Sequence, residues 1–205
     1  MAQLVRTDST TSSYFAECSA LLWEFMELRN QYFVLRGISG FGAIPVEAKY
    51  ANINLGQIKK FASYAHRNQL DKGGKPYIAH PIHVGDLFND PLRKALGYLH
   101  DTIEDTPVTW TEIYSLGLDS YFCACLRGIS RRSGESYDDY IQRVCSDIVI
   151  MDVKVADLSH NMDIRRLQVA DKWAVKRCKR YCAAMGTLVG VLVSRLNTGG
   201  TLSCK

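Results

Sequence analysis

No stretch of the 205-residue chain alternates apolar and polar side chains over a convincing length, and no segment repeats. The first absence speaks against β-strands and the second against repeat architectures. Long apolar runs are also missing, because the longest uncharged one near the C-terminus, about residues 183–193, is too short to span a bilayer. The N-terminus lacks a secretory pattern, since only Arg6 is basic before the polar residues 7–13. These absences predict an all-α, soluble cytoplasmic protein with no membrane contact.

A strong charge of either sign is absent as well. The formal net charge is +4 and charged residues make up 22% of the chain. This balance gives no argument for nucleic-acid binding, and it suits a small anionic substrate. The seven cysteines have no zinc-finger spacing, so we expect reduced structural thiols rather than a cysteine-based metal site or a disulfide framework.

Helical periodicity and turn residues divide the chain into three parts. Three glycines and a proline within residues 37–45 follow an expected helix at 14–36, so residues 1–45 are predicted to be an N-terminal extension. Its helix is either an appendage or an interface for a protein partner or a second copy of the chain. Residues 46–197 are predicted to form the main domain and 198–205 a flexible tail. Helices of the main domain are expected at about 55–69, 81–88, 91–106, 109–115, 118–129, 136–146, 148–162 and 170–196.

The stretch of residues 96–106 holds two adjacent pairs, His100 with Asp101 and Glu104 with Asp105. Continued as one helix, it places His100 over Glu104 and Asp101 over Asp105, because residues four apart share a face. Three carboxylates that close repel one another unless a cation or a proton lies among them. The stretch therefore predicts either a cation site or a solvated acidic face.

Residues elsewhere could complete a metal site with this stretch. His80 follows a glycine-containing loop, and Asp157 follows an apolar run. With His100 and Asp101 they offer two imidazoles and two carboxylates, a set suited to Mn²⁺, Fe²⁺ or Zn²⁺. Asn161 lies one helical turn after Asp157, where its amide could support a ligand or contact a substrate. Each residue alone is weak evidence, since most histidines are structural and most aspartates near helix ends are caps or ion-pair partners.

Three blocks of sequence resemble the HD-domain hydrolases of the Rel/SpoT type, which remove the 3′-pyrophosphate from the alarmones ppGpp and pppGpp. The first contains Lys-Gly-Gly-Lys-Pro-Tyr-Ile-Ala-His-Pro at 72–81, and the second is Leu-His-Asp-Thr-Ile-Glu-Asp-Thr at 99–106. The third is Val-Lys-Val-Ala-Asp at 153–157 with His-Asn-Met at 160–162. The size of the chain is similar to that of the stand-alone small alarmone hydrolases, which lack a synthetase domain. The second block is the most specific, since a bare His-Asp pair indicates only the wider HD superfamily.

The resemblance implies an all-α HD-domain helical bundle that binds one divalent metal, most often Mn²⁺. The metal ligands that it implies are His80, His100, Asp101 and Asp157. A divalent ion in such a site makes a bound water more acidic, so that water can attack phosphorus.

The same resemblance assigns the residues around the metal. Glu104 and Asp105 match the pair that orients or deprotonates the attacking water. Substrate contacts are expected from Lys72, which matches a residue near the guanine and phosphates, and from three further positions of the blocks, Lys75, Tyr77 and Asn161.

One position departs from the family pattern. The residue before Lys72 is usually arginine and is Asp71 here. An arginine can stack on a purine and pair with phosphate, whereas an aspartate repels phosphate. Guanine and adenine alarmones therefore both remain candidate substrates.

Two other functions compete with alarmone hydrolysis. The first is an HD phosphohydrolase for a nucleoside monophosphate, a deoxynucleotide or a cyclic nucleotide. The second is a non-catalytic module that binds a nucleotide or a protein partner. The intact set of metal-ligand and carboxylate positions argues against the second.

Several basic and imidazole groups have no assigned function at this point. Arg131 and Arg132 could hold a pyrophosphate or form a solvated loop, and the basic last helix is expected to present a solvated face. His66 is expected to support the local structure, and His83 is given no function.

Overall fold

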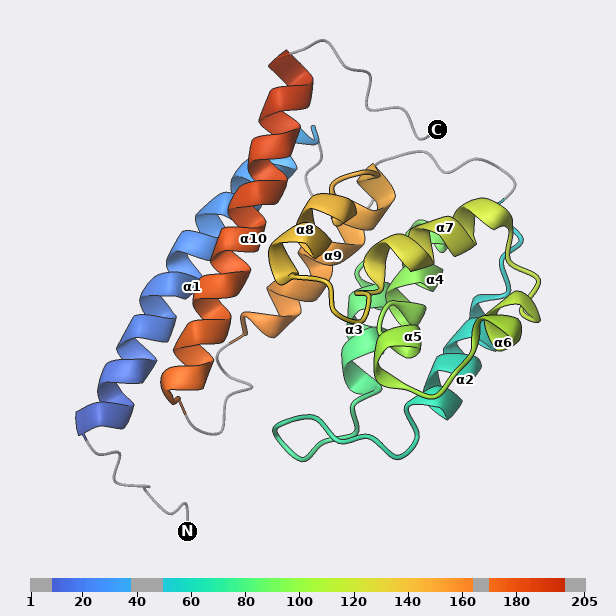
Figure 1. The fold of residues 1–205 in the computed structure, drawn as a ribbon, viewed down its shortest axis with the longest axis horizontal. Coiled ribbons are helices and arrows are strands. Elements are labelled where there is room, and N and C mark those ends of the chain that lie inside the picture. The colour runs from blue at the N-terminus through green and yellow to red at the C-terminus, as the bar shows by residue number, and fades with distance from the viewer. Residues whose placement is uncertain (1–8, 38–49, 164–169, 198–205) are drawn as a thin grey trace.

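The computed structural model describes residues 9–37, 50–163 and 170–197, and this part of the chain is helical without any strand (Figure 1). The predicted all-α class is confirmed. In chain order the helices are α1 (Ser9–Leu35), α2 (Leu55–Ala65), α3 (Ala79–Asp86), α4 (Pro91–Leu99), α5 (Thr102–Asp105), α6 (Trp110–Tyr114), α7 (Ser120–Ile129), α8 (Tyr137–Val144), α9 (Ile148–Asn161) and α10 (Lys172–Asn197). None of the helices described is both long and apolar enough to cross a bilayer.

The two longest helices, α1 and α10, lie side by side and run in the same direction, with α8 and α9 between them and the remaining helices (Figure 1). One face of α1 enters the common core through Cys18, Phe25 and Tyr32. The first helix is therefore packed onto the last, and only its opposite face, with Trp23 and Val34, is left for a partner. The division at residue 45 stays a prediction, because residues 38–49 lie outside the described part, as do residues 1–8 and the predicted tail at 198–205.

A buried ionic cluster joins α1 to the centre of the molecule. The Asp152 carboxylate on α9 accepts hydrogen bonds from the Tyr32 hydroxyl (2.8 Å), from Arg36 Nε and Nη2 (3.1 and 2.9 Å) and from Arg93 Nε on α4 (2.9 Å). Arg93 also pairs with Asp90, whose carboxylate caps the start of α4. Buried charges are stable only when paired, so this cluster fixes the relative positions of three helices.

Local capping signals place the helix ends well. Thr109 and Glu112 form the expected capping box at the start of α6, with both reciprocal hydrogen bonds present. Asp119, Ser136 and Asp147 cap α7, α8 and α9 by accepting a backbone N–H.

The central helix is shorter than expected. The sequence predicts one helix that carries residues 96–106, but α4 ends at Leu99 and the single turn α5 starts at Thr102. Asp101 lies between them with φ −97° and ψ −4°. The prediction of one uninterrupted helix over residues 96–106 is therefore wrong, although Asp101 and Asp105, one turn apart, still contact the same Tyr77 hydroxyl.

Helices α3 and α4 approach each other closely at two glycines. A Cβ atom on Gly97 would lie 2.7 Å from the Cα of Gly85, and one on Gly85 would lie 2.8 Å from the carbonyl oxygen of Lys94. No larger side chain fits at this crossing. The contact brings the helices of His80 and His100 to backbone distance.

Candidate active site

Four of the predicted residues converge at the junction of α3, α4 and α9. His80 Nε2 lies 3.1 Å from Asp157 Oδ1 and 3.5 Å from Asp101 Oδ2. His100 Nε2 lies 3.0 Å from Asp101 Oδ2 and 3.7 Å from Asp157 Oδ1. In three of the four, His80, His100 and Asp157, the donor atoms lie within 4.8 Å of one another, and all three side chains are buried.

The orientation of His100 turns its second nitrogen, Nε2, towards the carboxylates of Asp101 and Asp157. Its Nδ1 lies 2.7 Å from the carbonyl oxygen of Gly97, to which only an N–H can donate. This bond fixes the tautomer in which Nε2 carries a lone pair, and the buried Nε2 forms no hydrogen bond with any described residue. A lone pair facing two carboxylates requires a cation or a proton. Burial lowers the pKa of His100, but the Asp101 carboxylate outweighs it and raises the pKa well above its usual value.

Neighbouring side chains donate hydrogen bonds to the carboxylates of both Asp101 and Asp157. Asp157 accepts hydrogen bonds from Lys154 Nζ (2.7 Å) and Asn161 Nδ2 (2.6 Å). Asp101 Oδ2 accepts one from the Tyr77 hydroxyl (2.6 Å). Burial by itself would raise the pKa of Asp157, but Lys154 and the two histidines hold it well below the usual range. The Asp157 carboxylate is thus kept ionised in the core, as a metal ligand must be.

This donor set fits a divalent metal. Two imidazole nitrogens and two ionised carboxylates with supporting hydrogen bonds are typical ligands of Mn²⁺, Fe²⁺ and Zn²⁺. The Nε2 of His100 gives the clearest evidence, because its nearest neighbours are the carboxylate oxygens of Asp101 and Asp157, and only a cation or a proton between them would satisfy these groups. The site therefore suits a divalent ion.

The two remaining carboxylates of the predicted site face different cavities. Glu104 Oε2 accepts a hydrogen bond from the backbone N–H of Arg131 (3.0 Å), and Asp105 accepts one from the Tyr77 hydroxyl (3.2 Å). Both side chains are partly desolvated, and this desolvation, together with the Asp101 charge, raises the pKa of each. A carboxyl group with a raised pKa is a better proton acceptor near neutral pH.

Three adjacent cavities surround these groups. The central one, of about 150 Å³, contains Asp101, Glu104 and Asp157 with the cations Arg131, Lys154 and Arg180 along its walls. A second, of about 370 Å³, shares Tyr77, Asn161 and Tyr181 with it and extends to Lys72 and Arg177. The third, of about 570 Å³, shares Glu104 and Arg131 with the central one and is lined by residues 131–135. Through these shared residues the three cavities form one continuous cleft.

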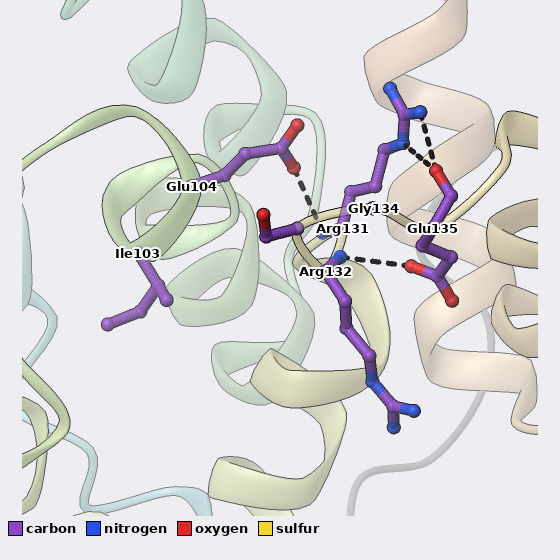
Figure 2. A pocket seen from close by; sticks show the side chains of 7 residues that line it. Ile103, Glu104, Arg131, Arg132, Gly134 and Glu135 are labelled. Atoms are coloured by element: carbon purple, nitrogen blue, oxygen red, sulfur yellow. Dashed lines mark hydrogen bonds between the residues drawn. The ribbon is translucent and has the colours of Figure 1, made fainter.

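Figure 2 shows the third cavity, where the loop of residues 131–135 faces Glu104. Arg131 donates from Nε and Nη2 to the Glu135 carbonyl (3.1 and 2.6 Å), and Glu135 accepts from the backbone N–H of Arg132 (2.9 Å). These bonds fold the loop so that its Arg131 amide points at Glu104. The Arg132 side chain extends away from Glu104 in this view.

The predicted substrate residues are distributed unequally. Lys72 lines the second cavity, and Tyr77 and Asn161 line both the central and the second. Lys75 is exposed on the turn and does not line these cavities. The Asp71 carboxylate accepts backbone N–H groups of Gly73 (2.8 Å) and Lys75 (2.9 Å), so it closes the turn that carries Lys72.

Comparison with known proteins supports the predicted resemblance, although no protein-family model matches the chain. A GTP pyrophosphokinase of Myxococcus xanthus is 32% identical over 119 residues, 50% of this chain and 16% of that protein. A probable guanosine-3′,5′-bis(diphosphate) 3′-pyrophosphohydrolase of Synechocystis is 32% identical over 117 residues, 50% of this chain and 15% of that protein. The Escherichia coli bifunctional (p)ppGpp synthase/hydrolase SpoT is 31% identical over 115 residues, 48% of this chain and 16% of that protein. The chain thus spans about one sixth of the length of these relatives.

A solved structure agrees in fold. A metazoan ortholog of SpoT, described as hydrolysing ppGpp, superposes with a TM-score of 0.52 at 18% sequence identity, over 78% of this chain and 100% of that chain. The fold is an HD-domain helical bundle. The resemblance to Rel/SpoT-type (p)ppGpp hydrolases predicted from the three sequence blocks is confirmed by the similar proteins.

Several residues of this HD-domain cleft were missed by sequence reasoning. Lys154 is a lone cation in an apolar run three residues before Asp157, and that spacing was the available signal. Arg177 and Arg180 were expected on a solvated face, but they line the second and the central cavity. Arg180 is exposed, as expected for a solvated face, but the place of α10 beside these cavities is not revealed by its sequence. Arg180 covers the ring of Tyr137, with 4.6 Å from the guanidinium carbon to the ring centre.

Proposed function

We propose that the chain is a metal-dependent hydrolase that removes the 3′-pyrophosphate from an alarmone such as ppGpp or pppGpp. One observation carries the proposal: the carboxylates of Asp101, Asp157 and Glu104 line one cavity together with three cations. The named hydrolase relatives support the same reaction. One matched relative is named as a pyrophosphokinase, but a metal-ligand cluster beside a desolvated carboxylate suits attack by water.

We assign the metal to His80, His100, Asp101 and Asp157, and we propose Mn²⁺ as the ion. When bound, a divalent ion supplies Lewis-acid chemistry, making a water more acidic and offsetting phosphate charge. Lys154 and Asn161 hold the Asp157 carboxylate in place, and Tyr77 holds Asp101.

Glu104 is the residue assigned to the attacking water. Its carboxylate is steadied by the Arg131 amide, borders the same cavity as the ligand carboxylates, and has a raised pKa through desolvation. It would orient the water and accept its proton while the water oxygen bonds to phosphorus. The bond from phosphorus to the ribose 3′ oxygen breaks, releasing pyrophosphate and a nucleoside di- or triphosphate. Asp105, bound to Tyr77, is assigned a supporting electrostatic function.

The cations of the cleft are assigned to the two phosphate groups of the substrate. Lys154, Arg131 and Arg180 border the central cavity and would offset charge on the transferred group. Lys72 and Arg177 border the second cavity, where they would contact the distal end of the nucleotide together with Asn161. Lys75 is retained only as a peripheral contact.

Because the proposed substrate is a nucleotide, we propose that the protein is located in the cytoplasm. We also propose that residues 46–197 form the catalytic domain. Any protein partner or second copy would use the exposed face of α1 around Trp23 and Val34.

The test is a hydrolysis panel on the purified protein with Mn²⁺, Mg²⁺ or Zn²⁺. Pyrophosphate release from ppGpp, pppGpp or ppApp is expected, and Asp101→Ala should lose Mn²⁺ binding and turnover together. Lys176→Ala, an exposed lysine on α10, is the matched surface control. Orthophosphate release from a nucleoside monophosphate would favour the rival HD phosphohydrolase. No release with any of these ions would refute the proposal.

A further inference from the structure

The two histidine ligands of the proposed metal site are oriented in different ways. His100 donates from Nδ1 to a backbone carbonyl, an arrangement that fixes its tautomer regardless of other side chains. Among the described residues, no carbonyl oxygen accepts a hydrogen bond from Nδ1 of His80. That nitrogen instead lies 2.6 Å from Nδ1 of His160, the penultimate residue of α9.

The geometry of this contact is that of an in-plane hydrogen bond. The two rings are 5° from parallel and their centroids are 4.9 Å apart. Two imidazoles that meet nitrogen to nitrogen in one plane have such a separation, whereas rings packed face to face at that angle would be closer. One of the two nitrogens carries the hydrogen and the other accepts it.

The direction of this hydrogen bond decides whether His80 can bind a metal. If His80 Nδ1 donates, its Nε2 keeps a lone pair that points towards Asp157 and Asp101. If His160 Nδ1 donates, the hydrogen of neutral His80 must be on Nε2, which then cannot be a ligand. A metal-binding His80 therefore needs a His160 that accepts at Nδ1.

The surroundings of His160 keep its ring in that position. His83, one turn after His80 on α3, stacks on His160 with 4.0 Å between centroids and 21° between planes. His80 and His83 come from α3, and Asp157 and His160 come from α9. Helices α3 and α9, which supply the proposed ligands His80 and Asp157, thus also supply His83 and His160. These two residues hold the His80 ring.

We propose that His160 is a positioning residue for the metal site: by accepting a hydrogen bond at Nδ1, it selects the His80 tautomer that can bind a divalent ion. The inference rests on the proposed function only in its use of His80 as a metal ligand. It gives a purpose to His160 beyond filling space between α3 and α9.

The test compares Mn²⁺ affinity, measured by calorimetric titration, with unfolding temperature measured in the presence of a chelator. His160→Phe keeps a ring that can stack on His83 but has no acceptor, and His160→Gln keeps an acceptor atom. Removal of a group that orients a metal ligand typically costs about 10–100-fold in affinity. We expect that loss in His160→Phe without a matching fall in stability, and a partial recovery in His160→Gln. Ser159→Ala, whose hydroxyl bonds only its own helix backbone, is the matched control.

Each outcome has one meaning. If the unmodified protein binds no Mn²⁺, Co²⁺ or Zn²⁺, the proposed function fails first. If it binds Mn²⁺ and His160→Phe binds it equally tightly, the positioning inference is overturned while the metal site stands. If His160→Phe does not fold, the Mn²⁺ affinities of His160→Gln and His160→Ala are compared instead. A folded His160→Gln that binds Mn²⁺ no more tightly than His160→Ala would also overturn the positioning inference. A visible absorption spectrum of the Co²⁺-loaded His160→Phe protein that differs from that of the Co²⁺-loaded unmodified protein would also indicate an altered metal ligand.

Discussion

The ionic cluster around Asp152 allows a quantitative prediction about how α1 is held. Asp152→Ala removes the acceptor of four hydrogen bonds and leaves Arg36 without its carboxylate partner in the core. Breaking a buried ion pair on one side costs about 3–5 kcal/mol, because the remaining charge is buried without compensation. A domain of this size loses about 2–4 °C of unfolding temperature per kcal/mol, so the expected fall is roughly 6–20 °C.

The chain contains a matched pair for comparison. A second ion pair also holds α1: Glu17 Oε1 on α1 lies 2.7 Å from Lys179 Nζ on α10. The side chains of Glu17 and Lys179 are 42% and 61% exposed. An exposed pair contributes about 0–1 kcal/mol, so Glu17→Ala should lower the unfolding temperature by only a few degrees. Thermal and urea unfolding followed by far-UV circular dichroism would measure both variants. Adding Arg36→Met to Asp152→Ala should recover part of the loss, because it removes the uncompensated charge.

The prediction is refuted if Asp152→Ala shifts unfolding no more than Glu17→Ala does. That result would mean that the Asp152 cluster contributes no more than a surface ion pair. The first helix would then be held chiefly by its apolar contacts, such as those of Cys18, Phe25 and Tyr32 in the core.

Three further predictions concern the cleft. Glu104→Gln should keep the Mn²⁺ affinity of the unmodified protein in calorimetry but lower kcat by about 10²–10⁴-fold, because the amide cannot accept the proton of the water; equal turnover would remove Glu104 from the mechanism. Arg180→Ala should raise KM for ppGpp by about ten-fold or more, as expected for a charged hydrogen bond, while Lys176→Ala leaves KM unchanged in the same steady-state assay. Hydrogen bonding to Arg143 lowers the pKa of Glu135 to about 2, so the stabilisation by this carboxylate is complete above its unfolded pKa of about 4.5 and is lost as the pH falls towards 2. The difference in unfolding temperature between Glu135→Gln and the unmodified protein should therefore be constant near neutral pH and vanish in acid; a constant difference down to pH of about 2 would contradict this.

Sequence patterns located the helices well because the signals at their ends are local. Thr109 and Glu112 interact across a single turn, so their spacing alone predicts the start of α6. The break at Asp101 has no such signal, since periodicity continues through residues 96–106. It coincides with tertiary contacts, in which Asp101 meets Tyr77 and the two histidines of the proposed metal site.

The site could be predicted only as far as its residues lie in recognisable blocks. Geometry brings His80, His100, Asp101 and Asp157 together as the resemblance implied, while their functions stay proposals. Arg177 and Arg180 lie on a helix whose charges look solvated when read alone. Their position on the cleft depends on how α10 crosses α8 and α9, which no local pattern encodes.

The contact between Gly85 and Gly97 has a chemical consequence although neither residue touches the cleft. These glycines allow the close approach of the helices that carry His80 and His100, so the absence of a Cβ atom at both positions would partly determine the size of the proposed metal site. Metal ions differ in the cage size that they accept, with Ca²⁺ tolerating a wider and more flexible one than Mg²⁺. The ion preference of the proposed metal site would therefore depend on this backbone crossing as well as on the ligands, and it could change without any substitution of a ligand.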